Sequence, residues 1–459
     1  MSLIIPANTL ASGGYAVDNS CRFNSGSSDN LSKTFGSGNQ KTWTWSGWVK
    51  LANIESTSEV IFGRLTATND SNWFTIDIRG NDKITIGIYN TNFLITNRLF
   101  RDVSAWYHIV VAFDTTQSTA DNRIKLYVNG VEETSFATRN NPSQDTDYPL
   151  NANVEHLLGK SWSTYYEGYM SEITFIDGLA LAPTDFGEFD EDSGIWKPID
   201  VSGLTFGTNG FYLDFKDSAA LGDDVSGNGN DFTVNNLTAI DQATDTPTNN
   251  FCTMNPLYPD GTITFSEGNL KLTIGSSWRS AGGTMAVSQG KWYWEVSNVG
   301  NYAYIGFADI QLFNEGCSIR ESFTTGAATT GNAYSVGNSD GRLYQVTSGG
   351  AQTSDYPASA TFSTFTNSII GIALNLDDNE ATFYKDGTAM NGGTAISITA
   401  GTYIPAVSVY GNNLSMNFGN PPFTISSGNA DGNGYGNFEY AVPSGYLSLC
   451  TANLSEVLS

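Results

Sequence analysis

Positively charged residues are scarce in this chain of 459 residues, and long apolar runs are missing. It holds 21 Lys and Arg residues against 46 Asp and Glu residues, so its formal net charge is −25. Such a surface repels phosphate backbones and anionic lipids, and we expect neither a nucleic-acid partner nor docking to such membranes. Because no apolar stretch approaches the roughly 20 residues of a membrane-spanning helix, membrane insertion is not expected.

Cysteine is also rare, and the four cysteines (Cys21, Cys252, Cys317 and Cys450) are widely spaced, without a C-x-x-C pair. The N-terminal sequence MSLIIPANTLASGG has neither the basic region nor the long apolar region of a secretory signal. We therefore expect a protein made in a cytosol, with free buried thiols and no disulfides or zinc site. If it works outside the cell, it leaves by lysis or inside a particle.

The residues for catalysis are few. Two histidines, His108 and His156, are present, and no G-x-S-x-G, H-E-x-x-H or P-loop motif occurs. Retaining glycosidases need two carboxylates about 5 Å apart, and the nearest match to their strand motif is the acidic segment 188–192. Its last acid is Asp, and Gly187 and Gly194 flank it. We interpret it as a solvated acidic turn and expect no enzyme.

Strand and turn signals are abundant. Ile109–Phe113 is a continuous apolar run, residues 124–128 alternate apolar and polar, and Asn129-Gly130 supplies the two positive φ values of a type I′ turn. The same hairpin pattern returns at residues 369–387, which end in Asp386-Gly387. With 48 glycines, 13% aromatic residues and a length that suits two domains, the sequence predicts an all-β protein with two tandem antiparallel β-sandwiches.

Residues 21–188 resemble the laminin-G-like, concanavalin A-type lectin domains. The resemblance is carried by T-W-S-G-W-V-K (Thr44–Lys50), W-Y-H-I-V-V-A-F-D (Trp106–Asp114), K-L-Y-V-N-G (Lys125–Gly130) and G-Y-M-S-E-I-T-F-I-D (Gly168–Asp177). It implies a jelly-roll sandwich. Trp48 and Trp106 are expected in its core.

Residues 261–423 resemble the SPRY/B30.2 domains. Five blocks follow the order of that family: 290–296, 303–309, 331–344, 369–387 and 403–411. The resemblance implies a second concanavalin-like jelly roll, which binds a ligand, usually a protein segment, through the loops between its strands. Trp292 and Trp294 are expected in its core. Around the two sandwiches we expect an extended arm (1–20), a connector (189–260) and a C-terminal tail (424–459) whose leucines dock on the second sandwich or on a partner.

The order of these parts also resembles virion proteins of tailed phages from marine bacteria. Three segments carry this resemblance: Ile4–Tyr15, Thr246–Leu257 and Pro443–Leu454. It implies a fibre or surface protein on the phage particle, made in the host cytoplasm and released by lysis. Other virion proteins would then be partners, and a homo-oligomer such as a trimer is expected.

Two groups of aromatic residues are candidates for sugar binding, because an aromatic face packs on a pyranose while nearby polar groups bind its hydroxyls. Trp162, Tyr165 and Tyr166 lie among hydroxyl residues in one predicted loop. Tyr302, Tyr304 and Tyr344 lie near predicted strand ends of the second sandwich. The alternative for each ring is a place in the core or at the sandwich edge.

One segment resembles half of a calcium-binding loop. Asp224, Ser226, Asn228 and Asn230 occupy alternate positions, but Asn235 stands where such a loop carries its bidentate acid. We favour a Gly/Asn-rich turn, with Ca²⁺ as the alternative, and expect no other cofactor.

These observations favour an adhesion protein whose sandwich loops bind a glycan or protein on the host-cell surface. The alternative is a structural role, as a capsid-decoration or tail-connector protein that binds no receptor. A polysaccharide-degrading enzyme is the least favoured.

Overall fold

Antiparallel sheets make up almost all of the regular structure in the computed structural model, which describes residues 14–54, 59–257, 262–297, 300, 302–314, 331–338, 340–347, 352–354 and 362–457. They belong to two units, an N-terminal unit that ends at Asn249 and a C-terminal unit that begins at Asn250. The predicted all-β fold is confirmed. No helix in the described part of the chain is long and apolar enough to cross a membrane.

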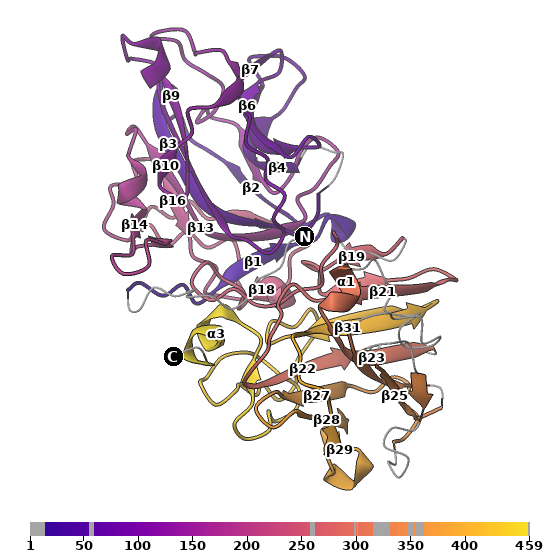
Figure 1. The fold of residues 1–459 in the computed structure, drawn as a ribbon. Coiled ribbons are helices and arrows are strands. Elements are labelled where there is room, and N and C mark those ends of the chain that lie inside the picture. The colour runs from indigo at the N-terminus through magenta and orange to yellow at the C-terminus, as the bar shows by residue number, and fades with distance from the viewer. Residues whose placement is uncertain are drawn as a thin grey trace. The chain divides into compact units, whose positions relative to one another are not determined.

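The N-terminal unit is a sandwich of two sheets. The first sheet has the order β10 (Val131–Glu132), β9 (Ile124–Val128), β8 (Tyr107–Asp114), β3 (Thr42–Leu51), β13 (Gly168–Asp177), β1 (Ser20–Phe23) and β18 (Gln242–Ala243), with β16 (Phe211–Leu213) also paired to β13. The second has the order β11 (Phe136–Arg139), β7 (Thr91–Thr96), β6 (Lys83–Ile88), β5 (Trp73–Arg79), β4 (Glu59–Leu65), β12 (Glu155–Leu158), β2 (Asn30–Thr34) and β17 (Thr233–Asn235). Figure 1 shows the two layers, with β3, β9 and β13 in one and β4, β6 and β7 in the other.

The central hairpin of this unit forms as the sequence predicts. β8 pairs with β9 in antiparallel register. The turn residues Asn129 and Gly130, which join β9 to β10, have φ values of 49° and 77°. The second hairpin repeats this geometry in the C-terminal unit, where Asp386 and Gly387 have φ values of 48° and 74°. Asn and Asp tolerate this left-handed conformation better than other side chains, which is why these dipeptides determine the turns.

Alternation along β3 sends its side chains to two different apolar environments. Trp43 and Trp45 point between the sheets, where the Trp43 ring stacks on Phe113 with centroids 4.7 Å apart. Gly47 follows in the same row, and a Cβ there would lie 2.5 Å from Ile173 Cδ1 and 2.8 Å from the Trp45 indole. Glycine at this position therefore makes room for the indole.

The other face of β3 carries Trp48, which is buried but not in the core between the sheets. It clusters with Trp106, Tyr169, Trp196 and Ala243 on the outer face of the first sheet. β14 (Gly187–Phe189) and β15 (Trp196–Pro198) form a hairpin, and Trp196 is the first residue of β15. The segment after residue 188 therefore supplies part of the cover.

The N-terminal unit therefore extends beyond the predicted boundary at residue 188, and residues 189–249 of the predicted connector 189–260 are part of it. β16, β17 and β18 lie in this stretch, and they pair with β13, β2 and β1, respectively. The stretch up to Asn249 completes both sheets of the N-terminal unit. The physical reason is that the outer face of the first sheet is apolar and needs this cover.

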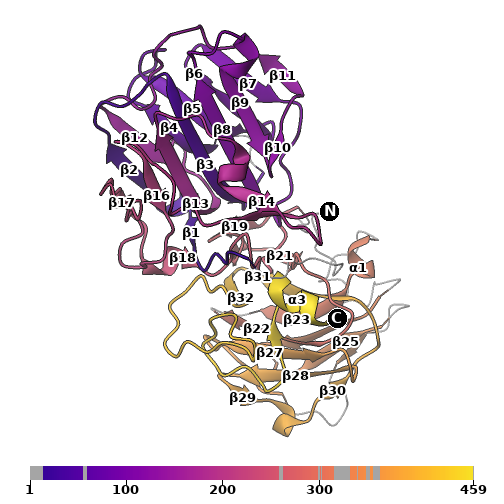
Figure 2. The ribbon, with the colours of Figure 1, turned by 90° about the vertical axis from the view of Figure 1, so that its left-hand side faces the viewer.

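The C-terminal unit is also a sandwich of two sheets. The larger has the order β19 (Thr264–Ser266), β20 (Lys271–Thr273), β32 (Asn413–Asn417), β22 (Lys291–Ser297), β27 (Ile370–Asn375), β28 (Glu380–Lys385) and β29 (Thr388–Ala389), with β30 (Ile396–Ser397) paired to β28 and β33 (Leu447–Ser448) paired to β22. The smaller has the order β21 (Trp278–Gly282), β31 (Tyr403–Tyr410), β23 (Ala303–Asp309), β24 (Ala333–Gly337), β25 (Leu343–Val346) and β26 (Gln352–Ser354). The short helices α1 (Gln311–Asn314) and α3 (Thr451–Val457) complete it (Figure 2). Trp292 and Trp294 lie in its core, as predicted.

The predicted tail 424–459, described here up to Val457, is an integral part of this unit and not a free segment. Leu449 and Leu454 are in its core, so of the two expected docking places the second sandwich is the one observed. Buried Glu295 accepts the backbone N–H groups of Glu439 and Tyr440 at 3.0 and 2.9 Å. Asp431 accepts the N–H and the hydroxyl of Ser448 at 2.8 and 2.7 Å.

The predicted N-terminal arm is described only from Gly14 onward, and residues 1–13 lie outside the described residues. The described part packs on its own unit: Val17 N–H donates to Thr248 Oγ1 at 3.0 Å, and the hydroxyls of Tyr15 and Tyr212 are 3.0 Å apart. Cys21, Cys252 and Cys450 are free and buried, as predicted, and Cys317 lies outside the described residues.

Glu172 makes the stability of the N-terminal unit depend on pH. It sits at the β-bulge of β13 with φ 53°, and the Tyr212 hydroxyl donates to its carboxylate at 2.7 Å. Burial raises its pKa from 4.5 to about 7. The folded protein therefore holds a proton that the unfolded chain releases above pH 4.5, so this group's contribution to stability is lost as the pH rises toward 7.

We predict that Glu172→Gln gains stability relative to the unaltered protein between about pH 5 and about pH 8, by up to about 3 kcal/mol, because glutamine stays neutral. Denaturant titrations of the two proteins at both pH values measure this difference. A difference that does not change with pH would contradict the assignment of the titration to Glu172.

Candidate functional site

A short hairpin presents the first group of candidate aromatic residues. Lys160 and Tyr165 form an antiparallel bridge, and Ser161 N–H donates to the Thr164 carbonyl at 2.8 Å. Trp162 lies in the turn between them and is 59% exposed. The Lys160 ammonium is 5.5 Å from the centre of the Tyr165 ring, a cation–π contact that orients the ring.

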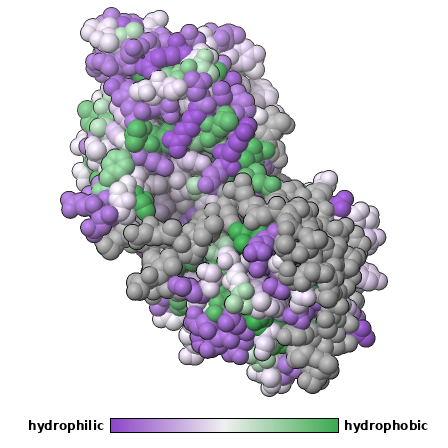
Figure 3. Space-filling view, in the orientation of Figure 1, coloured by the Kyte–Doolittle hydropathy of each residue, from purple (hydrophilic) through white to green (hydrophobic). Residues whose placement is uncertain are grey.

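Exposed aromatic residues are informative here because the surface is largely polar. In the view of Figure 3, hydrophilic residues cover the upper end of the N-terminal unit, and hydrophobic atoms reach the surface in separate patches. More than half of the Trp162 surface is exposed, so the fold gains only part of the stabilisation that full burial of an indole would give. Trp162 is therefore free to contact a ligand.

A groove with a volume of about 430 Å³ lies beside this hairpin. It is lined by Asn30, Ser32, Glu155, Leu157, Lys160, Tyr165, Val234, Asn235 and Asn236. The groove faces outward because of strand alternation: Leu31 of β2 and its partner Leu158 of β12 point into the core, so Asn30 and Ser32 point away from it.

Polar groups in the groove are held in place by one another. The Asn235 side-chain amide donates to Asn30 Oδ1 and to Ser32 Oγ, both at 3.2 Å, across the pairing of β17 with β2. Tyr165 therefore faces amide, hydroxyl, carboxylate and ammonium groups in a single groove. Glu155 is the one carboxylate among the described lining residues, so the lining does not hold the pair that glycoside hydrolysis requires.

Tyr166 does not belong to this site, and its prediction as a ligand-binding residue is wrong. Its side chain is fully buried, and its hydroxyl donates to the Lys50 carbonyl at 3.0 Å. Alternation explains the difference, because Tyr165 and Tyr166 are neighbours in an extended segment and point to opposite sides.

In the C-terminal unit, Tyr302, Tyr304 and Tyr344 belong to one aromatic cluster on the outer face of the smaller sheet. Trp278 and Tyr410, which the sequence analysis missed, connect them. Neighbouring ring centres in the series Tyr302–Tyr410–Trp278–Tyr304–Tyr344 are 5.2 to 6.1 Å apart. The missed signal is the cross-strand pairing of Trp278 with Tyr410, which local sequence does not show.

Exposure within the aromatic cluster is uneven. Tyr302 and Tyr410 are 54% and 37% exposed, whereas Tyr344 is 9% exposed and its hydroxyl donates to Asp340. Tyr344 therefore supports the cluster and does not offer a free face. The rings are tilted or edge-to-face, with interplanar angles of 37° to 87°. Such a rigid apolar patch with a hydroxyl rim is typical of protein-binding anchors.

Residues 224–231, predicted as a turn or a calcium loop, form a turn that is held by hydrogen bonds between its own side chains and nearby backbone groups. Asp224 Oδ1 accepts the N–H groups of Tyr212 and Ser226, both at 2.9 Å, and Oδ2 accepts that of Asn230 at 2.8 Å. The side-chain amides of Asn228 and Asn230 donate to the Gly210 carbonyl, both at 2.9 Å. These bonds account for the alternating Asp, Ser and Asn residues, and Ca²⁺ stays a prediction.

The acidic segment 188–192 and the two histidines are explained by contacts within the fold. Asp190 Oδ1 accepts the N–H and the hydroxyl of Ser193, and the Lys197 ammonium lies 3.1 Å from Oδ2. These contacts lower the pKa of Asp190 to about 2, so it has no proton to donate at neutral pH. Burial lowers the pKa of His108 and of His156 to about 3, which keeps both imidazoles neutral.

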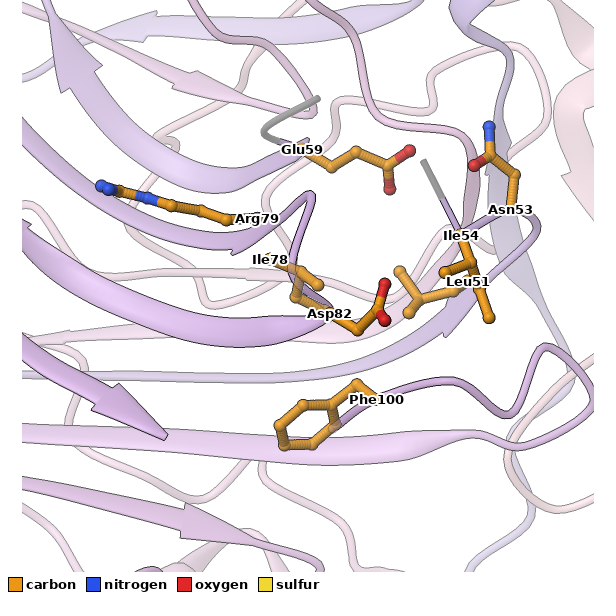
Figure 4. Close-up of a pocket in the computed structure, with 8 residues that line it drawn as sticks. All are labelled: Leu51, Asn53, Ile54, Glu59, Ile78, Arg79, Asp82 and Phe100. Carbon is orange, nitrogen blue, oxygen red and sulfur yellow. The ribbon is translucent and has the colours of Figure 1, made fainter. Parts of the chain in front are cut away.

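A small cavity lies elsewhere in the N-terminal unit, between the ends of several strands. Figure 4 shows the carboxylates of Glu59 and Asp82 and the amide of Asn53 directed at the same space. Its volume is about 10 Å³, about the lower limit for a single water molecule. It does not admit a sugar or a peptide.

The Asp224 turn gives a direct test. We predict that Asp224→Ala destabilises the N-terminal unit by about 3 kcal/mol, because three backbone N–H groups lose their acceptor. Thermal unfolding of both proteins measures this loss. Addition of a chelator should leave the melting temperature of the unaltered protein unchanged, and a lower melting temperature in chelator would instead identify a bound cation.

Comparison with known proteins assigns both units. Residues 24–184 match the family described as the concanavalin A-like lectin/glucanases superfamily, and residues 291–421 match the SPRY domain family. No curated protein matches the chain. Similar solved structures include the SPRY domain of human HERC1 (19% identity, 36% of this chain and 96% of that one, TM-score 0.27). A putative carbohydrate binding protein from Bacteroides ovatus is also similar (15% identity, 49% of this chain and 60% of that one, TM-score 0.35). By the family matches, the chain carries a concanavalin A-like domain followed by a SPRY domain.

Proposed function

We propose that this protein is a lectin-type adhesion protein that binds a glycan on the host-cell surface through the groove beside the Lys160–Tyr165 hairpin. The observation that carries the proposal is the convergence of polar side chains around Tyr165, next to exposed Trp162. The rings offer apolar faces to the C–H side of a pyranose, and Asn235, Asn30 and Ser32 offer amide and hydroxyl groups to its hydroxyls.

We place this adhesion protein on the surface of a tailed-phage particle. Support comes from the segments Ile4–Tyr15, Thr246–Leu257 and Pro443–Leu454, which resemble those of marine phage virion proteins. It is made in the host cytoplasm, reaches the outside by lysis and contacts other virion proteins. In a homo-oligomer, such as a trimer, several weak sites act together, because linked sites raise each other's effective concentration.

The aromatic cluster of the SPRY domain favours a second ligand class, a protein on the host surface. Its exposed edge, formed by Tyr302 and Tyr410, is rigid because the rings pack against Trp278 and against each other. Protein interfaces are enriched in such Tyr and Trp anchors.

For the glycan site, we predict that the double variant Trp162→Ala, Tyr165→Ala binds bacterial cells about tenfold or more weakly, because each lost aromatic contact costs about 1 kcal/mol. The measurement is binding of the labelled full chain to whole cells of a host panel, with and without periodate oxidation of their glycans. Periodate should abolish the part of the binding that the double variant loses.

Tyr89→Ala is the matched control, because Tyr89 is 47% exposed and does not line the groove. It should bind as well as the unaltered protein. Full binding by the double variant would reject the groove as the site. If the folded, unaltered protein binds no cells of the panel, a structural role as a decoration or connector protein takes the place of adhesion.

The aromatic cluster has its own test in the same assay. Tyr302→Ala with Tyr410→Ala should leave the periodate-sensitive binding unchanged and remove any binding that survives periodate, because it alters only the protein-binding edge. If this variant loses the periodate-sensitive part instead, the cluster binds glycan.

A further inference from the structure

The N-terminal unit brings a lysine and an aspartate together where solvent does not reach. Lys50 lies on the outer face of β3, and Asp245 follows β18, 195 residues later in the chain. Lys50 Nζ is 2.6 Å from Asp245 Oδ2, and the two side chains are 1% and 0% exposed. Because Oδ2 is bonded to Cγ, this contact also places Nζ close to the carboxyl carbon, the atom that an amine would attack.

The surroundings of this pair are largely aromatic. Trp48, Trp106, Tyr169 and Trp196 form the apolar cluster on this face, and Lys50 Nζ lies 5.5 Å from the centre of the Tyr169 ring. Bulk solvent does not reach either side chain. Transfer of one proton from the ammonium to the carboxylate would give an amine that can act as a nucleophile and an acid that can lose water.

Hydrogen bonds hold both the side chain and the backbone carbonyl of Asp245. The Trp106 indole N–H donates to Asp245 Oδ1 at 2.9 Å, on the carboxyl oxygen that Lys50 does not contact at 2.6 Å. The Ser20 hydroxyl donates to the Asp245 backbone carbonyl at 2.6 Å. The carboxyl group thus has a nucleophile beside one oxygen and a fixed hydrogen-bond donor on the other.

We propose that Lys50 and Asp245 condense into an isopeptide bond. After the proton transfer, the neutral Nζ attacks Cγ, and the negative charge that develops on Oδ1 is stabilised by the Trp106 N–H. The Nζ–Cγ bond forms and the Cγ–Oδ2 bond breaks. Oδ2 leaves as water, with the acid proton and one proton from the amine, so no oxidant or other reactant is needed.

The bond joins the central strand β3 to the last segment of the unit. It closes a covalent loop that contains most strands of both sheets, in a unit whose described cysteine, Cys21, is free. Aromatic cover excludes bulk water from the amide and so opposes its hydrolysis. This inference does not depend on the proposed adhesion function.

The test is the mass of the unaltered full chain after denaturation, followed by peptide mapping. The expected mass is lower than the sequence mass by one water molecule, with a branched peptide that joins Lys50 to Asp245. A full sequence mass would overturn the proposal. Loss of water without the branched peptide would also overturn it, because cyclisation at an Asp-Gly pair such as Asp386-Gly387 loses the same mass.

Three variants test the chemistry. Lys50→Arg keeps the positive charge but has no amine nucleophile, so it should show its full sequence mass. Asp245→Asn should lose ammonia in place of water. Trp106→Phe keeps an aromatic ring but removes the N–H donor, and it should leave a larger fraction of the chain without the bond. An equal extent of bond formation in Trp106→Phe would reject the role given to the indole.

Discussion

The N-terminal unit depends on the burial of both faces of its first sheet. In β3 and β13 nearly every residue is buried, although alternate side chains point to opposite sides. One side is the core between the two sheets, with Trp43 and Trp45. The other is the aromatic layer around Trp48, which residues after 188 cover. Because burial of apolar surface is the main driving force, the sheet and its cover form one folding unit.

This constraint explains which features the sequence predicts and which it does not. Turn chemistry is local, so Asn129-Gly130 and Asp386-Gly387 are enough to identify the tight turns that follow β9 and β28. A continuous apolar run, as in Ile109–Phe113, also correctly predicts a strand that is buried on both faces. The covering partner is not local: Gly, Asn and Asp dominate residues 216–231, and such a composition is equally typical of a linker. The pairing of β17 with β2 is visible only in the folded structure, because the two strands lie far apart in the sequence.

The candidate sites show the same division. Sequence identifies Trp162 and Tyr165 as aromatic residues in a polar loop, but period-two alternation alone does not say which of two neighbours faces solvent. Tyr166 is in the core for that reason. The partners of Tyr165 in the groove, Asn30 and Asn235, are about as far apart in the chain as the unit allows. No local sequence pattern could have found them. Trp278 and Tyr410 were missed for the same reason, because they meet only through the pairing of two strands that are distant in sequence.

In the C-terminal unit, buried carboxylates hold the tail in place together with apolar contacts such as that of Phe438 with Tyr293. Glu295 accepts the N–H groups of Glu439 and Tyr440, and Asp431 accepts the N–H and the hydroxyl of Ser448. These hydrogen bonds give the two buried carboxylates their partners. Burial raises the pKa of Glu295. The polar composition of residues 424–446, which favours a loose tail, is therefore compatible with a fixed one.

The groove draws one wall from β2, near the start of the N-terminal unit, and another from β17, near its end. During synthesis the first wall leaves the ribosome long before the second, and until β17 pairs with β2 the edge of the sheet carries unpaired backbone groups. The strand that closes this edge also builds the groove. A growing or truncated chain therefore lacks this groove, and the groove forms in the same step that protects the sheet edge from aggregation.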